Sequence, residues 1–220
     1  YTVGNATLNR FFALHYVMPF VILGVVGLHV AAVHVHGSNN PAGIDIKSKN
    51  DTVRFFPYMV MKDALATCVF GVIISAVIFF GPNLMAEVDN YIPADPLVTP
   101  AHIVPNWYLA PFYAILRAIP DKLGGVVLMF GSIAILFALP WLDRSKVKSI
   151  RYKGMASKSF LAIFVVAFFV LGYLGVQHPT PLKTFLAQIC TAIYFAYFLL
   201  MPWYTSVERT KLVPERIPMK

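Results

Sequence analysis

The sequence lacks charge over long stretches. Between Phe11 and Val35 it runs for 25 residues without a formally charged side chain. Its hydrophobic content of 58% exceeds the apolar fraction of about 45–50% that is usual for soluble domains. This composition excludes an ordinary soluble domain and predicts a polytopic membrane protein.

Cysteine is also scarce. The two cysteines, Cys68 and Cys190, both fall inside apolar segments and form no C-x-x-C motif. We expect them to be inert packing residues that do not indicate a redox compartment. The first residue is Tyr1, with neither an initiator methionine nor a signal peptide, so we expect that the natural N-terminal part is missing.

Five apolar segments are long enough to cross a bilayer. The first, Arg10 to His36, includes about 37 Å of uncharged helix, against a hydrocarbon core of about 30 Å. The other four lie at about 64–80, 125–142, 160–176 and 185–204. Residues 83–124 form a long connection, whose apolar stretches predict a partly helical, re-entrant region packed on the bundle. The sequence therefore predicts an all-α bundle of five spans with one long loop.

Basic residues mark one side of the predicted membrane. Fourteen of the 18 lysines and arginines fall in residues 37–63, 143–159 and 205–220, which five spans place on the same side. By the positive-inside rule this side is the cytoplasm or the matrix, so the long connection faces outward. The net charge of +8 thus reflects topology, and no nucleic-acid partner is expected.

Two histidines lie inside the first span, where polar side chains have no water as a partner. His15 and His29 are fourteen residues apart, so both rings leave the same side of the helix, about 21 Å apart along its axis. Neutral imidazole is a common axial ligand of haem iron, and Gly24 and Gly27 would let a flat macrocycle approach. The alternative is that each histidine hydrogen-bonds a neighbouring helix.

Several long motifs follow one another in a fixed order. They are TLNRFFALHYVMPF, a second histidine fourteen residues on, GSNNPAG, TPAHIVPNWYLAPFYAILRAIPDKLGGV and HPTP. In this order they resemble the C-terminal part of cytochrome b of the ubiquinol–cytochrome c oxidoreductase (cytochrome bc) complex. The resemblance implies that His15 binds a low-potential haem near the outer face and His29 a high-potential haem near the inner face. The partner histidines would come from a helix absent here, and His36 is interpreted as a surface residue.

The resemblance also implies a quinone-reducing site near the inner face, formed by His34, Ser38, Lys62 and Asp63. Quinone reduction consumes two protons, which Lys62 and Asp63 at the start of the second span can relay. The alternative is that Asp63 caps the helix and Lys62 contacts a lipid headgroup. Arg10 can pair with a haem propionate or with a lipid phosphate.

A quinol-oxidising site is implied in the outward loop. The family's tetrapeptide is usually Pro-Glu-Trp-Tyr, and here it is Pro105-Asn106-Trp107-Tyr108. A glutamate can accept a proton from quinol, whereas the amide of Asn106 can only hydrogen-bond. Either another group accepts the proton or the position was altered. Tyr113 matches the family's tyrosine beside the quinol, and the alternative for this loop is a structural element with an aromatic belt.

The resemblance divides the chain into three parts. Residues 1–36 would be a haem-ligand helix, 37–63 an inner surface loop, and 64–220 a domain with four spans and the quinol-oxidation loop at 83–124. The implied activity is that of the catalytic membrane subunit of a quinol–cytochrome c oxidoreductase coupled to proton translocation, with two haem b groups and ubiquinone or ubiquinol.

The same resemblance implies the partners and the location of the protein. The partners are a Rieske-type iron–sulfur protein, a cytochrome c1 subunit, membrane lipid and a second copy in a homodimer. The location is the bacterial inner membrane, with the mitochondrial inner membrane as the alternative. Two other functions are compatible with histidines inside spans: a di-haem membrane anchor of another quinone-linked dehydrogenase, and a proton-coupled transporter. A chain that only scaffolds a complex is a further alternative.

Overall fold

The structure is a computed structural model, and it describes residues 4–38, 40–84, 86, 88–95, 97–98, 100 and 102–216. These residues form helices, turns and loops without a strand, as the predicted all-α fold requires. The chain separates into two units. Of the described residues, those in 4–40 and 45–100 make up the first, and those in 41–44 and 102–216 make up the second.

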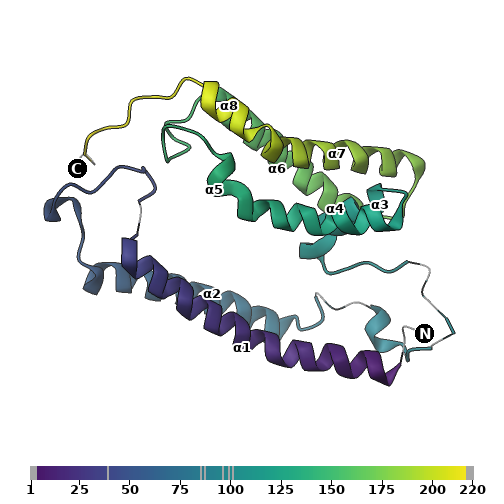
Figure 1. Ribbon diagram of the computed structural model, residues 1–220. Coiled ribbons are helices and arrows are strands. Elements are labelled where there is room, and N and C mark those ends of the chain that lie inside the picture. The colour runs from purple at the N-terminus through teal and green to yellow at the C-terminus, as the bar shows by residue number, and fades with distance from the viewer. Residues whose placement is uncertain are drawn as a thin grey trace. The chain divides into compact units, whose positions relative to one another are not determined.

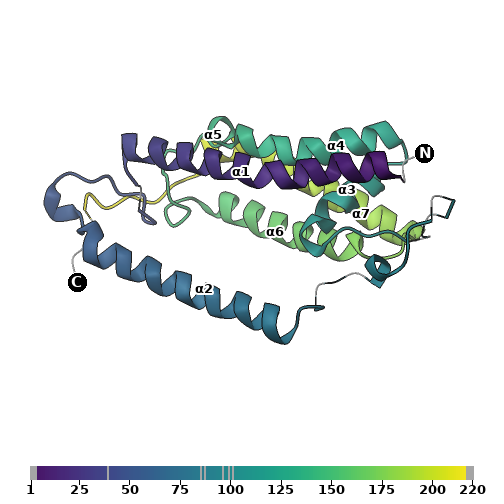
Figure 2. The same ribbon diagram turned by 90° about the horizontal axis from the view of Figure 1, so that it is seen from below.

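Two long helices dominate the first unit. α1 (Asn5–His36) is one continuous helix of 32 residues (Figures 1 and 2). Pro19 lies inside it. α2 (Val60–Phe80) is a helix of 21 residues. Neither helix contains a buried residue, so both expose apolar side chains around their circumference, as helices in contact with lipid do. Short helical turns occur at η1 (Lys49–Asp51), η2 (Phe55–Met59) and η3 (Val88–Tyr91).

The second unit is a bundle built around three helices. α3 (Ala110–Ala118), α6 (Met155–Gly175) and α7 (Pro181–Leu199) pack against one another, and α6 and α7 lie side by side (Figure 1). The remaining elements are η4 (Trp107–Leu109), α4 (Lys122–Ala134), η5 (Ile135–Ala138), α5 (Leu139–Leu142) and α8 (Met201–Val207).

Glycine permits the closest helix contacts in this bundle. A Cβ atom at Gly175 of α6 would clash with the carbonyl of Ala110 in α3, and one at Gly125 of α4 would clash with the carbonyl of Leu116. Any other residue at either position would push α3 away from its neighbour. These two contacts fix the position of α3, the helix that follows the tetrapeptide at 105–108.

Aromatic rings fill the space between α6 and α7. Phe164 of α6 stacks on Tyr197 with 4.5 Å between ring centroids, and it also contacts Tyr194 and Phe198. Tyr194 is buried, and its hydroxyl donates a hydrogen bond of 2.8 Å to the carbonyl of Ser132 in α4. The one polar atom of this buried ring is therefore satisfied, and the bond connects α7 to α4.

The N-terminal end of α6 is hydrogen-bonded to the segment that follows α8. At its N-terminal end, the Glu208 carboxylate accepts hydrogen bonds from the backbone N–H and the hydroxyl of Ser157, at 3.0 Å and 2.6 Å. Glu208 follows α8, so the end of the bundle is tied to the start of α6. Close by in sequence, Lys153 is buried and forms an ion pair with Asp143.

Within the described residues, five helical segments are long and apolar enough to cross a membrane. This confirms the predicted number of spans. They are Asn5–His36, Lys49–Phe80, Lys122–Leu142, Met155–Gly175 and Pro181–Leu199. The last span was predicted to reach Tyr204, but α7 ends at Leu199 and α8 begins at Met201. Pro202 explains the difference, because it has no backbone N–H to continue the helix and is favoured in the first turn of a new one.

Candidate functional site

α1 carries both predicted haem ligands on one continuous helix. His15 and His29 are exposed, and the unbroken helix between them preserves the spacing that puts their rings on the same side. A Cβ atom added at Gly24 or Gly27 would meet nothing within 4 Å, so the backbone between the histidines is open to a flat group. The open surface hollow beside His15 is lined by Leu8, Phe11, Phe12 and Tyr16.

The surroundings of His15 fit one face of a haem. An exposed imidazole next to apolar and aromatic side chains is what a haem-binding helix offers to the iron and the porphyrin. The described part of the chain contains no group of three or more His, Cys, Asp or Glu side chains that could hold a metal ion by itself. Each histidine would therefore supply a single axial nitrogen. Arg10 lies on the same helix, five residues before His15, and is exposed.

The four residues expected at the inner site lie at helix ends. His34 is in the last turn of α1 and Ser38 follows that helix, whereas Lys62 and Asp63 are in the first turn of α2. All four are exposed. Across the ranges that the structure describes, no hydrogen bond joins one of them to another. No side chain caps the start of α2 by a hydrogen bond, so capping by Asp63 is not what orders this helix end.

The tetrapeptide at 105–108 leads directly into α3. The carbonyl of Asn106 accepts a hydrogen bond of 2.9 Å from the N–H of Leu109, which starts η4. The Asn106 Nδ2 atom donates to the Tyr108 hydroxyl at 3.4 Å. Trp107 meets the Tyr108 ring edge to face, with 5.8 Å between centroids. The Asn106 amide thus faces a neighbouring phenol and offers no atom that takes up a proton.

Tyr113 is held at both its ring and its hydroxyl. The hydroxyl donates a hydrogen bond of 3.1 Å to the carbonyl of Ile103. The guanidinium of Arg117 lies over the ring, 4.7 Å from its centroid, where it makes a cation–π contact. Because a phenol has a single O–H hydrogen, the Tyr113 oxygen in this arrangement can only accept a hydrogen bond from a ligand.

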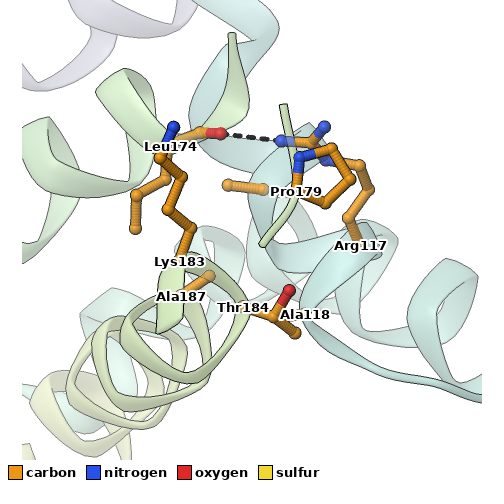
Figure 3. Close-up of a pocket in the computed structure, with 8 residues that line it drawn as sticks. Arg117, Ala118, Leu174, Pro179, Lys183, Thr184 and Ala187 are labelled. Atoms are coloured by element: carbon orange, nitrogen blue, oxygen red, sulfur yellow. Dashed lines mark hydrogen bonds between the residues drawn. The ribbon is translucent and has the colours of Figure 1, made fainter. Parts of the chain in front are cut away.

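Arg117 binds the C-terminal end of α6 and was missed by sequence reasoning. Its Nη2 atom donates to the carbonyl of Leu174 at 2.7 Å (Figure 3). The same atom donates to the carbonyl of Gly175 at 3.1 Å, and the Nη1 atom donates to that of Gln177 at 3.1 Å. A cation at this end of a helix satisfies free carbonyls and opposes the negative end of the helix dipole. Arg117 therefore joins α3 to α6 while it holds Tyr113.

A small cavity lies beside Arg117, between α3, α7 and the end of α6. It has a volume of about 20 Å³, enough for a single water molecule and too little for a quinone ring. It is therefore a packing feature of the helix junction and not a substrate site. Its lining includes Ala118, Leu174, Pro179, Lys183, Thr184 and Ala187 (Figure 3).

Two further histidines, also missed by sequence reasoning, lie together in the second unit. The rings of His102 and His178 stack with 3.8 Å between centroids and 27° between planes. The Nε2 atom of His102 lies 3.4 Å from the carbonyl oxygen of Val176. His102 is partly buried and His178 is exposed. Both belong to motifs that carry the family resemblance. The presence of a histidine in each motif was the only sequence feature that could have singled these residues out.

Comparison with known proteins adds two family matches. The family described as cytochrome b (N-terminal)/b6/petB matches residues 1–111, and the family described as cytochrome b (C-terminal)/b6/petD matches residues 93–195. The first match covers the helix with His15 and His29, and the second covers the tetrapeptide and α3. The two matches overlap at residues 93–111 and together extend over most of the chain.

Individual proteins are similar over nearly the whole chain. Cytochrome b of Allochromatium vinosum is 50% identical over 99% of this chain and 57% of its own length. Cytochrome b of Rickettsia prowazekii is 53% identical over 98% of this chain and 54% of its own length. A solved structure titled "Hyperthermophilic respiratory Complex III" aligns with a TM-score of 0.86 and 34% identity, over 94% of this chain and 53% of that chain. The chain thus spans about half the length of these relatives.

Proposed function

The chain belongs to the cytochrome b family, which implies haem binding, and from this premise we propose that it acts in the di-haem membrane subunit of a quinol–cytochrome c oxidoreductase. In this proposal ubiquinol is oxidised at an outer site and quinone is reduced at an inner site, coupled to proton translocation. The observation that carries the proposal is the pair of exposed histidines, His15 and His29, on one uninterrupted helix within the region that matches the N-terminal family.

The haem helix supplies ligands and an arginine. A bound haem accepts and passes on single electrons, and His15 and His29 would each give one imidazole nitrogen to a separate haem iron. Arg10 extends from the same helix near its N-terminal end. Its guanidinium can form two parallel hydrogen bonds to a propionate carboxylate, which would orient the outer haem.

The outer site uses the segment before α3 and α3 itself. Trp107 and Tyr108 present exposed aromatic rings, and Asn106 presents an amide. Tyr113 has already donated its hydrogen to the backbone, so its oxygen can accept a hydrogen bond from a quinol hydroxyl but cannot donate one to a quinone carbonyl. This arrangement favours the reduced substrate, which is the one that a quinol-oxidising site must select.

The inner site would take protons from the aqueous side. Lys62 and Asp63 are exposed in the first turn of α2, where they can exchange protons with water. His34 and Ser38 lie at and just beyond the end of α1 and offer hydrogen-bonding groups for a quinone carbonyl. Two protons would be taken up here by the quinone that is reduced, and two would be released at the outer site by the quinol that is oxidised, so the two reactions together would move charge across the membrane.

The proposed setting is a multi-subunit complex in a membrane. The similarity to a structure of a respiratory Complex III supports assembly with a Rieske-type iron–sulfur protein and a cytochrome c1 subunit, in a homodimer surrounded by lipid. Bacterial relatives support the inner membrane of a bacterium as its location.

The test replaces each histidine in the assembled complex and records reduced-minus-oxidised visible spectra. His15→Leu is expected to remove the outer haem and His29→Leu the inner haem, so each variant should lose about half of the b-type absorbance, since each imidazole binds one iron. His36→Leu is the control and should retain the full spectrum, because His36 lies at the helix end and is exposed. Two normal haems in His29→Leu would refute the assignment.

A further inference from the structure

One buried nitrogen of Arg117 has no hydrogen-bond partner among the residues that the structure describes. The Nη1 and Nη2 atoms donate to carbonyls at the end of α6, but the Nε atom, which is buried, bonds to none of these residues. A buried N–H group without an acceptor is costly, because it has lost its hydrogen bond to water and gains none in return. The Nε–H group therefore indicates an acceptor that the neighbouring side chains and backbone do not supply.

The cavity beside Arg117 has room for one small molecule. Its volume is about 20 Å³, and a single ordered water needs about 10–15 Å³ of such space. Arg117 and Ala118 line it from α3, Leu174 from the end of α6, and Thr184 from α7 (Figure 3). The space thus lies where three helices meet, and the residue with the unpaired N–H group forms part of its wall.

Thr184 brings a second polar atom to this cavity. Its backbone N–H donates to the carbonyl of Thr180 at 2.9 Å, but within the described ranges its hydroxyl bonds to no other residue. Two other threonines of the bundle, Thr191 and Thr205, bond instead to the carbonyl four residues earlier, at 2.7 Å and 2.6 Å. The Thr184 hydroxyl is therefore available to a molecule in the cavity.

The lining favours a molecule that both donates and accepts hydrogen bonds. The Arg117 Nε atom can only donate, whereas the carbonyl of Leu174 can only accept and keeps a lone pair beyond the one that Arg117 uses. Lys183, the other cation of the lining, already donates to the Oε1 atom of Gln177 at 3.2 Å. A small anion would accept from Arg117 but would be repelled by the carbonyl and by the negative end of the α6 dipole. Water satisfies both kinds of group.

We propose that this cavity binds one ordered water molecule, which accepts a hydrogen bond from Arg117 Nε and bonds to the hydroxyl of Thr184. The inference is independent of the proposed function, because it concerns the packing of helices in the second unit. The water gives the buried guanidinium its remaining acceptor. It also adds a polar link between α3 and α7, which the Nε2 atom of Gln188 already connects by donating to the carbonyl of Ala118 at 2.9 Å.

This water holds the guanidinium from a third direction. The Nη atoms bind the end of α6, and the ring of Tyr113 lies against the face of the cation, with 4.7 Å between the ring centroid and the guanidinium carbon. Through the water, the Nε atom is bonded to α7. Arg117 thereby connects α3 to both α6 and α7, and its position over Tyr113 is fixed by both.

The first test is a structure of the intact complex at a resolution that shows ordered water. The wild-type map is expected to contain one peak at about 2.7–3.2 Å from both Arg117 Nε and Thr184 Oγ1. Thr184→Ser keeps the hydroxyl and should keep the peak. Thr184→Val has nearly the same shape without the hydroxyl and should lose most of the peak. Thr67→Val is the matched control, since it makes the same change at an exposed position of α2 and should keep the peak.

The second test measures thermal unfolding of the same variants of the complex. In a dry cavity, replacing an unbonded hydroxyl by a methyl group raises the Tm, because burial of the methyl group is favourable and no hydrogen bond is lost. In a cavity that holds water, the same change removes a partner of the bound water and lowers the Tm. We therefore expect Thr184→Val to unfold at a lower temperature than Thr67→Val, and Thr184→Ser to stay closer to the wild type.

Crystals of the complex soaked in sodium bromide separate water from a small anion. No anomalous bromide peak is expected in the cavity. Three results would each overturn the proposal: a wild-type map without a peak in the cavity, a Thr184→Val variant that keeps the full peak or unfolds at the temperature of Thr67→Val or above it, and a bromide peak beside Arg117.

Discussion

The single hydroxyl hydrogen of Tyr113 is already used in a hydrogen bond, which under the proposed function limits the form of the substrate that this hydroxyl could bind. The phenol donates that hydrogen to the carbonyl of Ile103, so only its lone pairs face a ligand. A quinol has hydroxyl hydrogens to donate, and a quinone has none. Under the proposed function, the bond to the backbone at Ile103 would therefore favour binding of quinol over quinone at this residue.

Replacing Tyr113 by phenylalanine tests this selection. The variant keeps the ring under Arg117 and removes only the hydroxyl. One lost hydrogen bond of about 1 kcal/mol corresponds to roughly a fivefold increase in KM for quinol, with a smaller effect on quinone binding. Steady-state kinetics of the intact complex would measure it, with product inhibition by quinone recorded in parallel. An equal weakening of quinol and quinone binding would contradict the role of the bonded hydrogen.

The sequence offered candidate site residues, which stay predictions, but it did not show how their side chains are held. The spacing of His15 and His29 follows from helix geometry alone, and α1 preserves it. Tyr113 and the tetrapeptide were found by resemblance. Arg117 was missed because its partners, Leu174, Gly175 and Gln177, lie 57 to 60 residues away along the chain. No local pattern reports a contact between separate helices.

At the scale of elements, α6 has opposite charges bound at its two ends. Glu208 accepts from Ser157 in its first turn, and Arg117 donates to the carbonyls at its end. Both charges have the sign that the helix dipole favours. Because Arg117 comes from α3 and Glu208 from the segment after α8, these two sets of hydrogen bonds fix the axial position of α6 in the bundle.

Arg117→Leu is expected to lower the stability of the complex by about 2 kcal/mol or more, since it leaves partly buried carbonyls without donors. Arg117→Lys should recover part of the loss, because a lysine keeps the charge but not the planar set of donors. Thermal unfolding of the detergent-solubilised complex would measure both variants. Equal stability of the leucine variant and the wild type would show that the helix end does not depend on these bonds.

Glu208→Gln tests the other end of the same helix. The amide can still accept from the hydroxyl or the N–H of Ser157, but it loses the charge that the helix start favours. The expected loss of stability is about 1 kcal/mol, smaller than for Arg117→Leu. Asp89→Gln is a suitable control, because it also replaces an acid by an amide and lies far along the chain in η3. A loss as large as that of Arg117→Leu would contradict the charge argument.

Element boundaries were predicted less well than element number. Apolar runs gave all five membrane-spanning segments, but the last was extended to Tyr204 across the break at Leu199. Both sides of that break are apolar, so hydropathy alone does not register it. Pro202 was the available signal, because a proline favours the first turn of a new helix over the interior of an old one.

At the scale of the whole molecule, the distribution of basic residues predicts which loops share a side of the membrane. Lys146→Cys lies on the predicted inner side and Leu97→Cys on the outer side. A membrane-impermeant maleimide should label Leu97→Cys in right-side-out vesicles and Lys146→Cys in inverted ones. Wild-type vesicles give the background from Cys68 and Cys190. Labelling of both variants in the same type of vesicle would contradict the prediction, because it would place residues 97 and 146 on the same side of the membrane.

α1 has no buried residue, and its apolar side chains are spread around its whole circumference. Contact with lipid then gives the helix no preferred rotation about its own axis, because all of its faces are similarly apolar. Under the proposed ligation, the two imidazoles on one side of α1 distinguish that side from the others. Binding of the two haems would then fix the rotation of the helix about its axis. Haem insertion would thus orient the helix during assembly, in addition to supplying the redox group. Without haem, no particular side of the helix would be directed toward its neighbours.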